Sequence, residues 1–306
     1  MTGLAQLVAD GVLTERAPLA ALTTYKFGGP ARWLLEADSE DDLIRLAAAL
    51  AEEPAPVPVV VLGRGSNVVI SDLGFRGVVV RPGPGLGGLE IGADGTCRTG
   101  GALPLPVLAR RAAEADRGGL EFYVGIPGSV GGAVCMNAGC HGSDTAEWLV
   151  TARIADVRTG RVREAGPSDL GMSYRHSEVG GDEVVTAAVF RTVPRARADA
   201  EERMRAITAW RREHQPGGTL NAGSVFKNPP NDSAGRLIDS LGLKGFRVGA
   251  VSVSARHANF FVAGEGATAQ DVHDLVAEVR RRVYEESGVL LEPEVRFVGR
   301  FSGDAR

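Results

Sequence analysis

Small residues and polar side chains are concentrated in one stretch of this chain, residues 121–142, which reads EFYVGIPGSVGGAVCMNAGCHG. Six of these residues are glycine, at positions 125, 128, 131, 132, 139 and 142. Glycine lets a backbone approach a ligand closely and adopt positive φ without strain. Successive backbone N–H groups can form a concave anion site, and Ser129 and Asn137 add polar side chains. The stretch therefore indicates a loop around a phosphate-bearing cofactor or, alternatively, a set of tight turns between short strands.

A second candidate for cofactor contact is the turn Gly63-Arg64-Gly65-Ser66-Asn67. It follows an apolar segment at 59–62 and precedes another at 68–70, and both have the composition of buried strands. A Rossmann dinucleotide site requires a helix directly after its glycines, and residues 67–72 do not begin one. The turn therefore indicates either a cofactor contact in a different fold or a plain hairpin turn.

Hydrophobic periodicity and turn residues predict the elements that would hold these loops. The N-terminal twenty residues predict a short amphipathic helix and a turn. Further helices are expected at 40–53, where Asp38 and Ser39 can cap the first turn, and at 105–115, 195–213, 233–241 and 268–286. Strands are expected at 59–62, 68–70, 77–81, 85–99 (as a hairpin), 148–164 (as a hairpin), 184–193, 248–253, 259–262 and 289–298. This order, without an internal repeat, predicts an α+β fold.

Bulk properties narrow the possible functions. A chain of 306 residues permits two or three domains. The formal charge of −4 makes nucleic acid an unfavourable partner. The chain has no window of ~18 uninterrupted apolar residues, so we expect no membrane span, and the N-terminus lacks the pattern of a signal peptide. The three cysteines form no CxxC pair and His141 and His257 have no metal-ligand spacing, so we expect neither disulfides nor a metal site and predict a cytoplasmic protein.

Six motifs occur in a fixed order along the chain: Thr23-Thr24 with Gly28–Ala31, LGRGSN at 62–67, GIPGSVGGAVCMNAG at 125–139, Tyr174-Arg175-His176-Ser177, NAGSVFKNP at 221–229, and LEPEVR at 291–296. This set resembles the UDP-N-acetylenolpyruvoylglucosamine reductase family, flavoenzymes that complete UDP-N-acetylmuramic acid for peptidoglycan. The resemblance covers about residues 20–300.

The resemblance implies an FAD-binding module of the vanillyl-alcohol-oxidase type in two subdomains, 1–75 and 76–195. An α+β substrate-binding domain would follow at 208–300, with Glu294 on its closing strand. The FAD would be non-covalent, since neither the turn at 63–67 nor the loop at 125–133 contains a histidine for a covalent bond. The residues that would hold the FAD are Gly63, Arg64, Gly65, Ser66, Asn67, Gly125, Ile126, Pro127, Gly128, Ser129, Gly131, Gly132 and Ala133.

The implied reaction has two halves. NADPH reduces the flavin, and the reduced flavin passes a hydride to the terminal carbon of the enolpyruvyl group of UDP-N-acetylglucosamine enolpyruvate. The product is UDP-N-acetylmuramate. We expect the protein to be a monomer. No long insertion separates Ser177 from the strand expected at 184, so the chain resembles the shorter branch of the family, which lacks an inserted loop whose tyrosine covers the substrate.

Three residues match the catalytic positions of the family. Ser224 matches the donor of a proton to C2, although a serine after Gly223 can also bond its own backbone in a tight turn. Arg175 matches the arginine that binds the substrate carboxylate through its bidentate fork, although a surface ion pair is the plain alternative. Glu294 matches an acid that stabilises the enediolate, and Glu292, two positions away on the same face of the expected strand, is its rival.

Four further residues are expected near the substrate: Lys227, Asn228, Arg296 and Arg212. A diphosphate and a carboxylate require local cations, which an acidic chain must concentrate. Two other functions fit parts of this pattern. One is a flavin oxidase of small alcohols or lactones, which would have a covalent-flavin histidine and a different C-terminal half. The other is a non-catalytic flavin or nucleotide-binding module, which would not need Arg175, Ser224 and Glu294 together.

Overall fold

The structure, a computed structural model, describes residues 3–303. Within this range the chain forms two compact units, each built from three segments. The first unit comprises residues 3–15, 33–64 and 77–210, and the second comprises 16–32, 65–76 and 211–303. The chain therefore crosses from one unit to the other five times, and one crossing falls between Arg64 and Gly65, inside the second glycine-rich turn.

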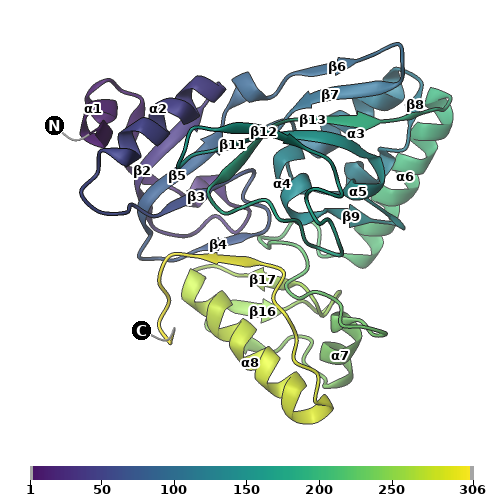
Figure 1. Cartoon of the computed structure of the whole chain (residues 1–306). Helices are drawn as coiled ribbons and strands as arrows, with labels where there is room; N and C mark the ends of the chain where they lie inside the picture. Colours follow the sequence, from purple (N-terminus) through teal and green to yellow (C-terminus); the bar gives the residue numbers. More distant parts are fainter. Residues whose placement is uncertain (1–2, 304–306) are drawn as a thin grey trace. The chain divides into compact units, whose positions relative to one another are not determined.

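The N-terminal part of the first unit contains a four-stranded sheet (Figure 1). Its strand order is β1 (Leu13–Pro18), β2 (Pro30–Ala37), β5 (Phe75–Pro82) and β3 (Val59–Val61). Helices α1 (Gly3–Ala9) and α2 (Glu40–Ala51) pack on this layer. Ser39 caps the N-terminus of helix α2 and forms a reciprocal capping box with Asp42, and the first turn of the helix is acidic, as the helix dipole prefers.

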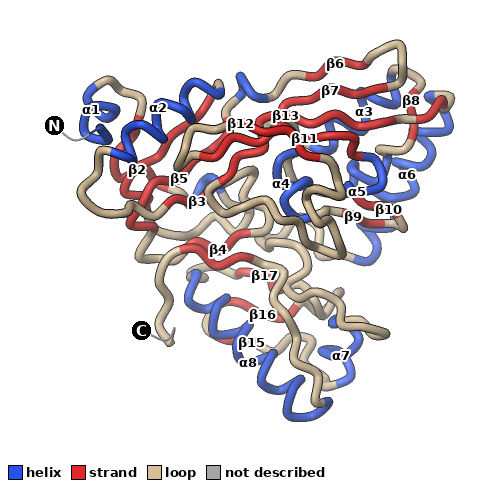
Figure 2. The backbone as a smooth tube through the Cα atoms, in the orientation of Figure 1, coloured by secondary structure: helices blue, strands red, loops and turns tan. Residues whose placement is uncertain are grey.

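The rest of the first unit is built on a five-stranded antiparallel sheet (Figure 2). Its order is β12 (Val162–Ala165), β11 (Leu149–Asp156), β13 (Glu183–Arg191), β7 (Thr96–Gly100) and β6 (Leu89–Ile91). Helices α3 (Leu105–Glu114) and α4 (Val130–Met136) bury their apolar residues in the same core as this sheet. The helix α6 (Arg197–His214) has 18 residues; it begins in the first unit and ends in the second. The smaller elements of the first unit are η2 (Pro84–Leu86), β8 (Arg117–Gly118), η3 (Glu121–Gly125), β9 (Gly139–Cys140), β10 (Ser143–Asp144), α5 (Thr145–Trp148) and β14 (Val193–Pro194), and the short η1 (Ala20–Leu22) belongs to the second unit.

The second unit has its own core, between helices and a three-stranded antiparallel sheet. The sheet contains β15 (Arg247–Val248), β16 (Val251–Val253) and β17 (Phe261–Ala263), and the helices are α7 (Ala234–Ser240) and α8 (Ala269–Ser287). Helix α8 buries Ala269 and the residues that its periodicity predicts, Val272, Leu275, Val276, Val279 and Val283. It ends at Gly288, which has the left-handed conformation of a C-terminal cap.

The strand pairing of the second glycine-rich turn excludes the hairpin alternative. Strand β3, before the turn, pairs in parallel with β5 in the first unit. Strand β4 (Val68–Ile70), after the turn, pairs in parallel with β18 (Arg296–Val298) in the second. The two strands do not pair with each other, so the turn joins two different sheets.

Several expected elements are wrong in extent. The segment expected as one strand at 289–298 is a strand only over Arg296–Val298, and Glu294 precedes it. The strand expected at 248–253 is the hairpin of β15 and β16, because Gly249 turns the chain with φ 54°. Strand β1 was not expected, since its residues LTERAP show no clear alternation. Among residues 3–303, no helix has the length and apolar character needed to span a membrane.

Candidate active site

The first glycine-rich run is partly helical, which corrects the expectation of a loop. Helix α4 begins directly after Ser129, whose Oγ accepts a hydrogen bond from the N–H of Gly132 at 3.4 Å. Gly131, Gly132 and Ala133 therefore lie in this helix rather than in a loop. Gly131 is small for a packing reason, since a Cβ there would lie 3.2 Å from the carbonyl oxygens of Gly101 and Val185.

Most N–H groups at the start of α4 are already used. The N–H of Val130 donates to the Leu103 carbonyl at 3.0 Å, and that of Gly131 donates to the Gly101 carbonyl at 2.8 Å. Within residues 3–303, the N–H groups of Gly128 and Ser129 have no such acceptor. The backbone donors that a ligand could use are therefore those of the loop before the helix.

The two glycine-rich segments meet in the first unit. A Cβ on Gly63 would lie 2.9 Å from the Oγ of Ser129, so the backbone of the turn after β3 lies directly against the Ser129 side chain. The Ser129 residue is 4% exposed. Residues 63 and 129 are 66 positions apart, and no local pattern in the sequence could place them together.

The remainder of the second turn belongs to the second unit and packs there against residues 22–24. Gly65 has φ 62°, and a Cβ on it would lie 2.1 Å from the Leu22 carbonyl oxygen. The N–H of Thr24 donates to the Gly65 carbonyl at 3.1 Å. The last residue of the turn is hydrogen-bonded to the LEPEVR motif at 291–296. Asn67 Nδ2 donates to the Glu294 carbonyl at 3.0 Å, and the Arg296 N–H donates to the Asn67 carbonyl at 3.0 Å.

Ser224 and Glu294 lie on neighbouring segments of the second unit. The carbonyl of Val225, next to Ser224, accepts the N–H of Glu294 at 2.8 Å and that of Val295 at 3.3 Å. Both candidate side chains belong to half-buried residues. Because Glu294 is not on a strand, the expected common strand face with Glu292 is wrong.

Asn259, which the motif analysis missed, supports the serine segment. It is buried, accepts the N–H of Phe226 at 2.9 Å through Oδ1 and donates to the Phe226 carbonyl at 2.8 Å through Nδ2. Its own carbonyl accepts the N–H of Val225 at 2.9 Å. One side chain thus satisfies both backbone groups of Phe226, as buried polar groups require. The sequence carries no indication of this role beyond an asparagine in an apolar segment.

The expected substrate residues already have intramolecular contacts. Lys227 Nζ lies 2.6 Å from Glu292 Oε1, so Glu292, the alternative to Glu294 in the LEPEVR motif, forms an ion pair with Lys227. Asn228 Oδ1 accepts the N–H of Ala234 at 3.1 Å, at the start of α7. The exposed Arg212 lies in the last turn of α6, and its carbonyl accepts a hydrogen bond from Arg256 Nη1 at 2.9 Å. A ligand would have to compete for or share the Lys227 ammonium.

Arg175 lies in the first unit and has an unusual backbone. Its φ is 54°, in the left-handed region that few non-glycine residues occupy. The surrounding turn is closed by reciprocal backbone hydrogen bonds between Ser173 and His176, each at 3.1 Å. The Arg175 Nη2 donates to the Gly139 carbonyl at 2.7 Å, and the guanidinium lies 5.1 Å from the centroid of the Tyr174 ring. Such strain concentrates at functional sites and needs support from its surroundings.

His257 and Cys97 both have shifted pKa values that favour their neutral forms. Burial lowers the pKa of His257, whose Nδ1 accepts the N–H of Asn259 at 3.3 Å, which favours a neutral imidazole. Burial raises the pKa of the Cys97 thiol to about 11. Within residues 3–303, no three His, Cys, Asp or Glu side chains form a group that could hold a metal ion.

Comparison with known proteins assigns both parts of the chain. Residues 31–166 match a family model described as "FAD binding domain", and residues 215–298 match one described as "UDP-N-acetylenolpyruvoylglucosamine reductase, C-terminal domain". The chain is similar to the UDP-N-acetylenolpyruvoylglucosamine reductase of Rubrobacter xylanophilus, with 46% identity over 284 residues, which are 92% of this chain and 94% of the relative. The chain belongs to the UDP-N-acetylenolpyruvoylglucosamine reductase family.

Other members of the UDP-N-acetylenolpyruvoylglucosamine reductase family agree. The enzyme of Azorhizobium caulinodans is 43% identical over 290 residues, covering 94% of this chain and 92% of the relative. The crystal structure of the reductase from Thermus caldophilus has a TM-score of 0.79 and 36% identity, covering 93% of this chain and 98% of that one. The predicted fold, an α+β chain with an FAD-binding module of the vanillyl-alcohol-oxidase type, is confirmed, and the chain is an oxidoreductase of peptidoglycan precursor synthesis.

Proposed function

We propose that this reductase converts UDP-N-acetylglucosamine enolpyruvate to UDP-N-acetylmuramate, with NADPH as hydride donor and non-covalent FAD. Bound FAD would supply the hydride chemistry, accepting a hydride from NADPH and delivering one to the terminal carbon of the enolpyruvyl group. The residues present suit such a cofactor. The close approach of Gly63 to Ser129 and the open N–H groups of Gly128 and Ser129 are what a diphosphate needs from a backbone.

In the proposed reaction, Arg175 holds the substrate carboxylate through its guanidinium fork. Ser224 gives a proton to C2, and Glu294, as a hydrogen-bonded acid, stabilises the enediolate formed at the substrate carboxylate. Lys227, Asn228, Arg296 and Arg212 contact the nucleotide-sugar. The observation that supports the proposal is the hydrogen bond from the Glu294 N–H to the Val225 carbonyl, which brings the proton-donor segment beside the acid. Two side chains that act on adjacent atoms of one substrate have to come from neighbouring segments.

A stopped-flow experiment on Ser224→Ala tests this function. Flavin reduction by NADPH should keep its rate, because the serine takes no part in it. Flavin reoxidation by the enolpyruvyl substrate should slow by about 10²–10⁴-fold, the usual contribution of general acid catalysis. Absorbance of the flavin separates the two halves. Equal slowing of both half-reactions would assign Ser224 a different role. If the unaltered enzyme did not oxidise NADPH in the presence of this substrate, the proposed reaction would be excluded.

The non-covalent state of the flavin has its own test. The purified protein should be yellow, and acid precipitation should release FAD into the supernatant. Flavin in the pellet would instead indicate a covalent bond and favour the oxidase alternative.

We further propose a cytoplasmic monomer with domains at 1–75, 76–195 and 208–300. Size-exclusion chromatography with light scattering tests the monomer.

A further inference from the structure

We infer that a buried ion pair between Glu121 and Arg195 positions the glycine-rich run against FAD. The inference rests on the proposed contact between that run and the cofactor. Arg195 Nη1 lies 3.1 Å from Glu121 Oε1, and the two side chains are 20% and 7% exposed. Within residues 3–303 neither of these two atoms has a hydrogen-bond partner, so their charges are compensated mainly by each other in this ion pair. Loss of one partner leaves an uncompensated buried charge.

The pair joins two segments that are far apart in sequence. Glu121 begins η3, and its other carboxylate oxygen accepts the N–H of Gly119 at 2.8 Å. Arg195 lies between β14 and α6, and its own N–H donates to the Asp116 carbonyl at 3.0 Å. Strands β8 and β14 pair here, residue 117 with 194 and residue 118 with 193. The start of η3 is therefore fixed to the entry of helix α6.

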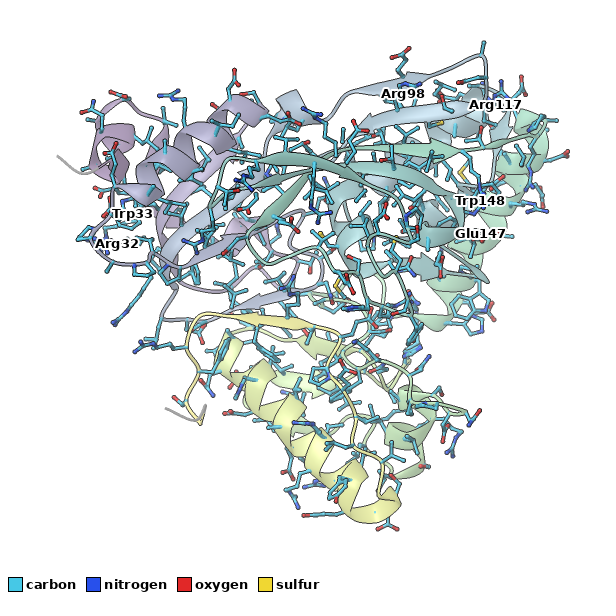
Figure 3. The ribbon with its side chains drawn as sticks, in the orientation of Figure 1. Arg32, Trp33, Arg98, Arg117, Glu147 and Trp148 are labelled. Atoms are coloured by element: carbon cyan, nitrogen blue, oxygen red, sulfur yellow. The ribbon has the colours of Figure 1, made fainter. Side chains whose placement is uncertain are left out.

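Packing around the pair leaves little freedom. A Cβ on Gly118 would lie 2.6 Å from Arg195 Nε, so the guanidinium lies directly over that glycine. A Cβ on Gly119 would lie 2.3 Å from the ring of Trp148, which is labelled in Figure 3. The glycines at 118 and 119 thus let the backbone pass close to the Arg195 side chain and to the Trp148 ring, and the Glu121 carboxylate is 7% exposed beside them, where a lost partner is costly.

The short helix η3 connects this ion pair to the glycine-rich run. Its residues Phe122 and Tyr123 are buried, and Tyr123 Oη donates to Thr145 Oγ1 at 2.9 Å. The Thr145 hydroxyl in turn donates to the Ala138 carbonyl at 2.8 Å, just beyond α4. The helix η3 ends at Gly125, the first residue of the proposed FAD contact. A shift at Glu121 would thus move the loop 125–129 relative to the rest of the unit.

Three variants test the inference: Glu121→Gln, Arg195→Gln and the double variant. Each single variant should raise the Kd for FAD at least tenfold, measured by titrating folded apoprotein with FAD and following flavin fluorescence. The double variant should be no worse than the weaker-binding single one, because the two residues act as a unit. At saturating FAD the rate of flavin reduction by NADPH should return to within about threefold of the unaltered enzyme.

A stability-matched control separates positioning from general destabilisation. Leu46→Ala opens a cavity in a different core cluster of the same unit and should lower the Tm without changing the Kd for FAD by more than about twofold. If Glu121→Gln does not fold, Arg195→Lys, which keeps the charge, should fold and show a smaller rise in Kd. An unchanged Kd in folded Glu121→Gln, or an equal rise in Leu46→Ala, would overturn the inference. Failure of the unaltered protein to bind FAD would overturn the proposed function instead.

Discussion

At the residue scale, Arg175 combines backbone strain with fixed hydrogen bonds. A non-glycine residue in the left-handed region costs about 1–3 kcal/mol, and the turn at 173–176 and the Gly139 carbonyl hold it there. The rigid guanidinium is therefore already oriented before a carboxylate arrives. Pre-oriented donors lose less entropy on binding than a mobile side chain does.

Arg175→Lys tests whether the fork matters beyond its charge. Lysine keeps the positive charge but cannot bind a carboxylate through two parallel N–H groups. Loss of a charge-assisted hydrogen bond worth about 1.5–3 kcal/mol should lower kcat/KM for the enolpyruvyl substrate by about 10- to 100-fold. The exposed Arg203→Lys on α6 serves as a control and should have no effect. A similar loss in flavin reduction by NADPH would contradict the assignment.

At the element scale, helix α8 has its N-terminus held from two directions. Thr268 and Asp271 form a local capping box. Asp72, from the segment after β4, accepts the N–H groups of Ala269 and Gln270, each at 3.1 Å. These bonds satisfy donors that an isolated helix leaves open, and the negative charges suit the helix dipole. The inserted segment 65–76 is thereby fastened to the C-terminal part of the second unit.

Asp72→Ala should lower the free energy of unfolding by about 1–2 kcal/mol, the usual range for loss of an N-terminal cap. Urea denaturation followed by circular dichroism measures the change. Glu286→Ala, an exposed substitution near the other end of α8, should stay within about 0.5 kcal/mol of the unaltered protein. No change in Asp72→Ala would mean that the local capping box alone fixes the helix start.

At the scale of the whole molecule, one charged cluster joins the two sheets of the first unit. Glu40 begins α2, and it accepts hydrogen bonds from Arg153 of β11 at 2.7 and 2.8 Å and from Thr186 of β13 at 2.6 Å. The Arg153 hydrogen bonds hold the pKa of Glu40 below its ordinary value of 4.5. Helix α2, on the four-stranded sheet, is thus fixed to strands β11 and β13 of the five-stranded one.

This cluster predicts how stability depends on pH. Because the folded pKa of Glu40 is lower than the unfolded one, the unfolded chain binds more protons near pH 4.5. The contribution is complete above about pH 5.5 and is lost as the pH falls through the folded pKa, with a slope of at most about 1.4 kcal/mol per pH unit. In Glu40→Gln, the free energy of unfolding from urea titrations should fall less steeply as the pH is lowered below about 5.5. An unchanged pH dependence in this variant would show that other carboxylates determine the acid sensitivity.

Local features of the fold were predictable from the sequence because short-range physics sets them. Helices α2, α3, α6 and α8 follow from periodicity and capping residues, and the hairpins of β6 with β7 and of β11 with β12 follow from their turns. The helix α4 was missed because its glycines suit a loop equally well. Only the cap at Ser129 and the packing of Gly131 on Gly101 and Val185 make it helical.

The sequence by itself determined the family, the α+β class and the motifs from which the site residues are proposed. The tertiary structure alone decided which of these residues are neighbours. The hydrogen bond from Asn67 to Glu294 joins positions 227 residues apart, and the parallel pairing of β4 with β18 is equally distant in sequence. Periodicity reports which face of an element is buried. The partner of that element is chosen by hydrogen bonds and packing between distant segments, which leave no period in the sequence.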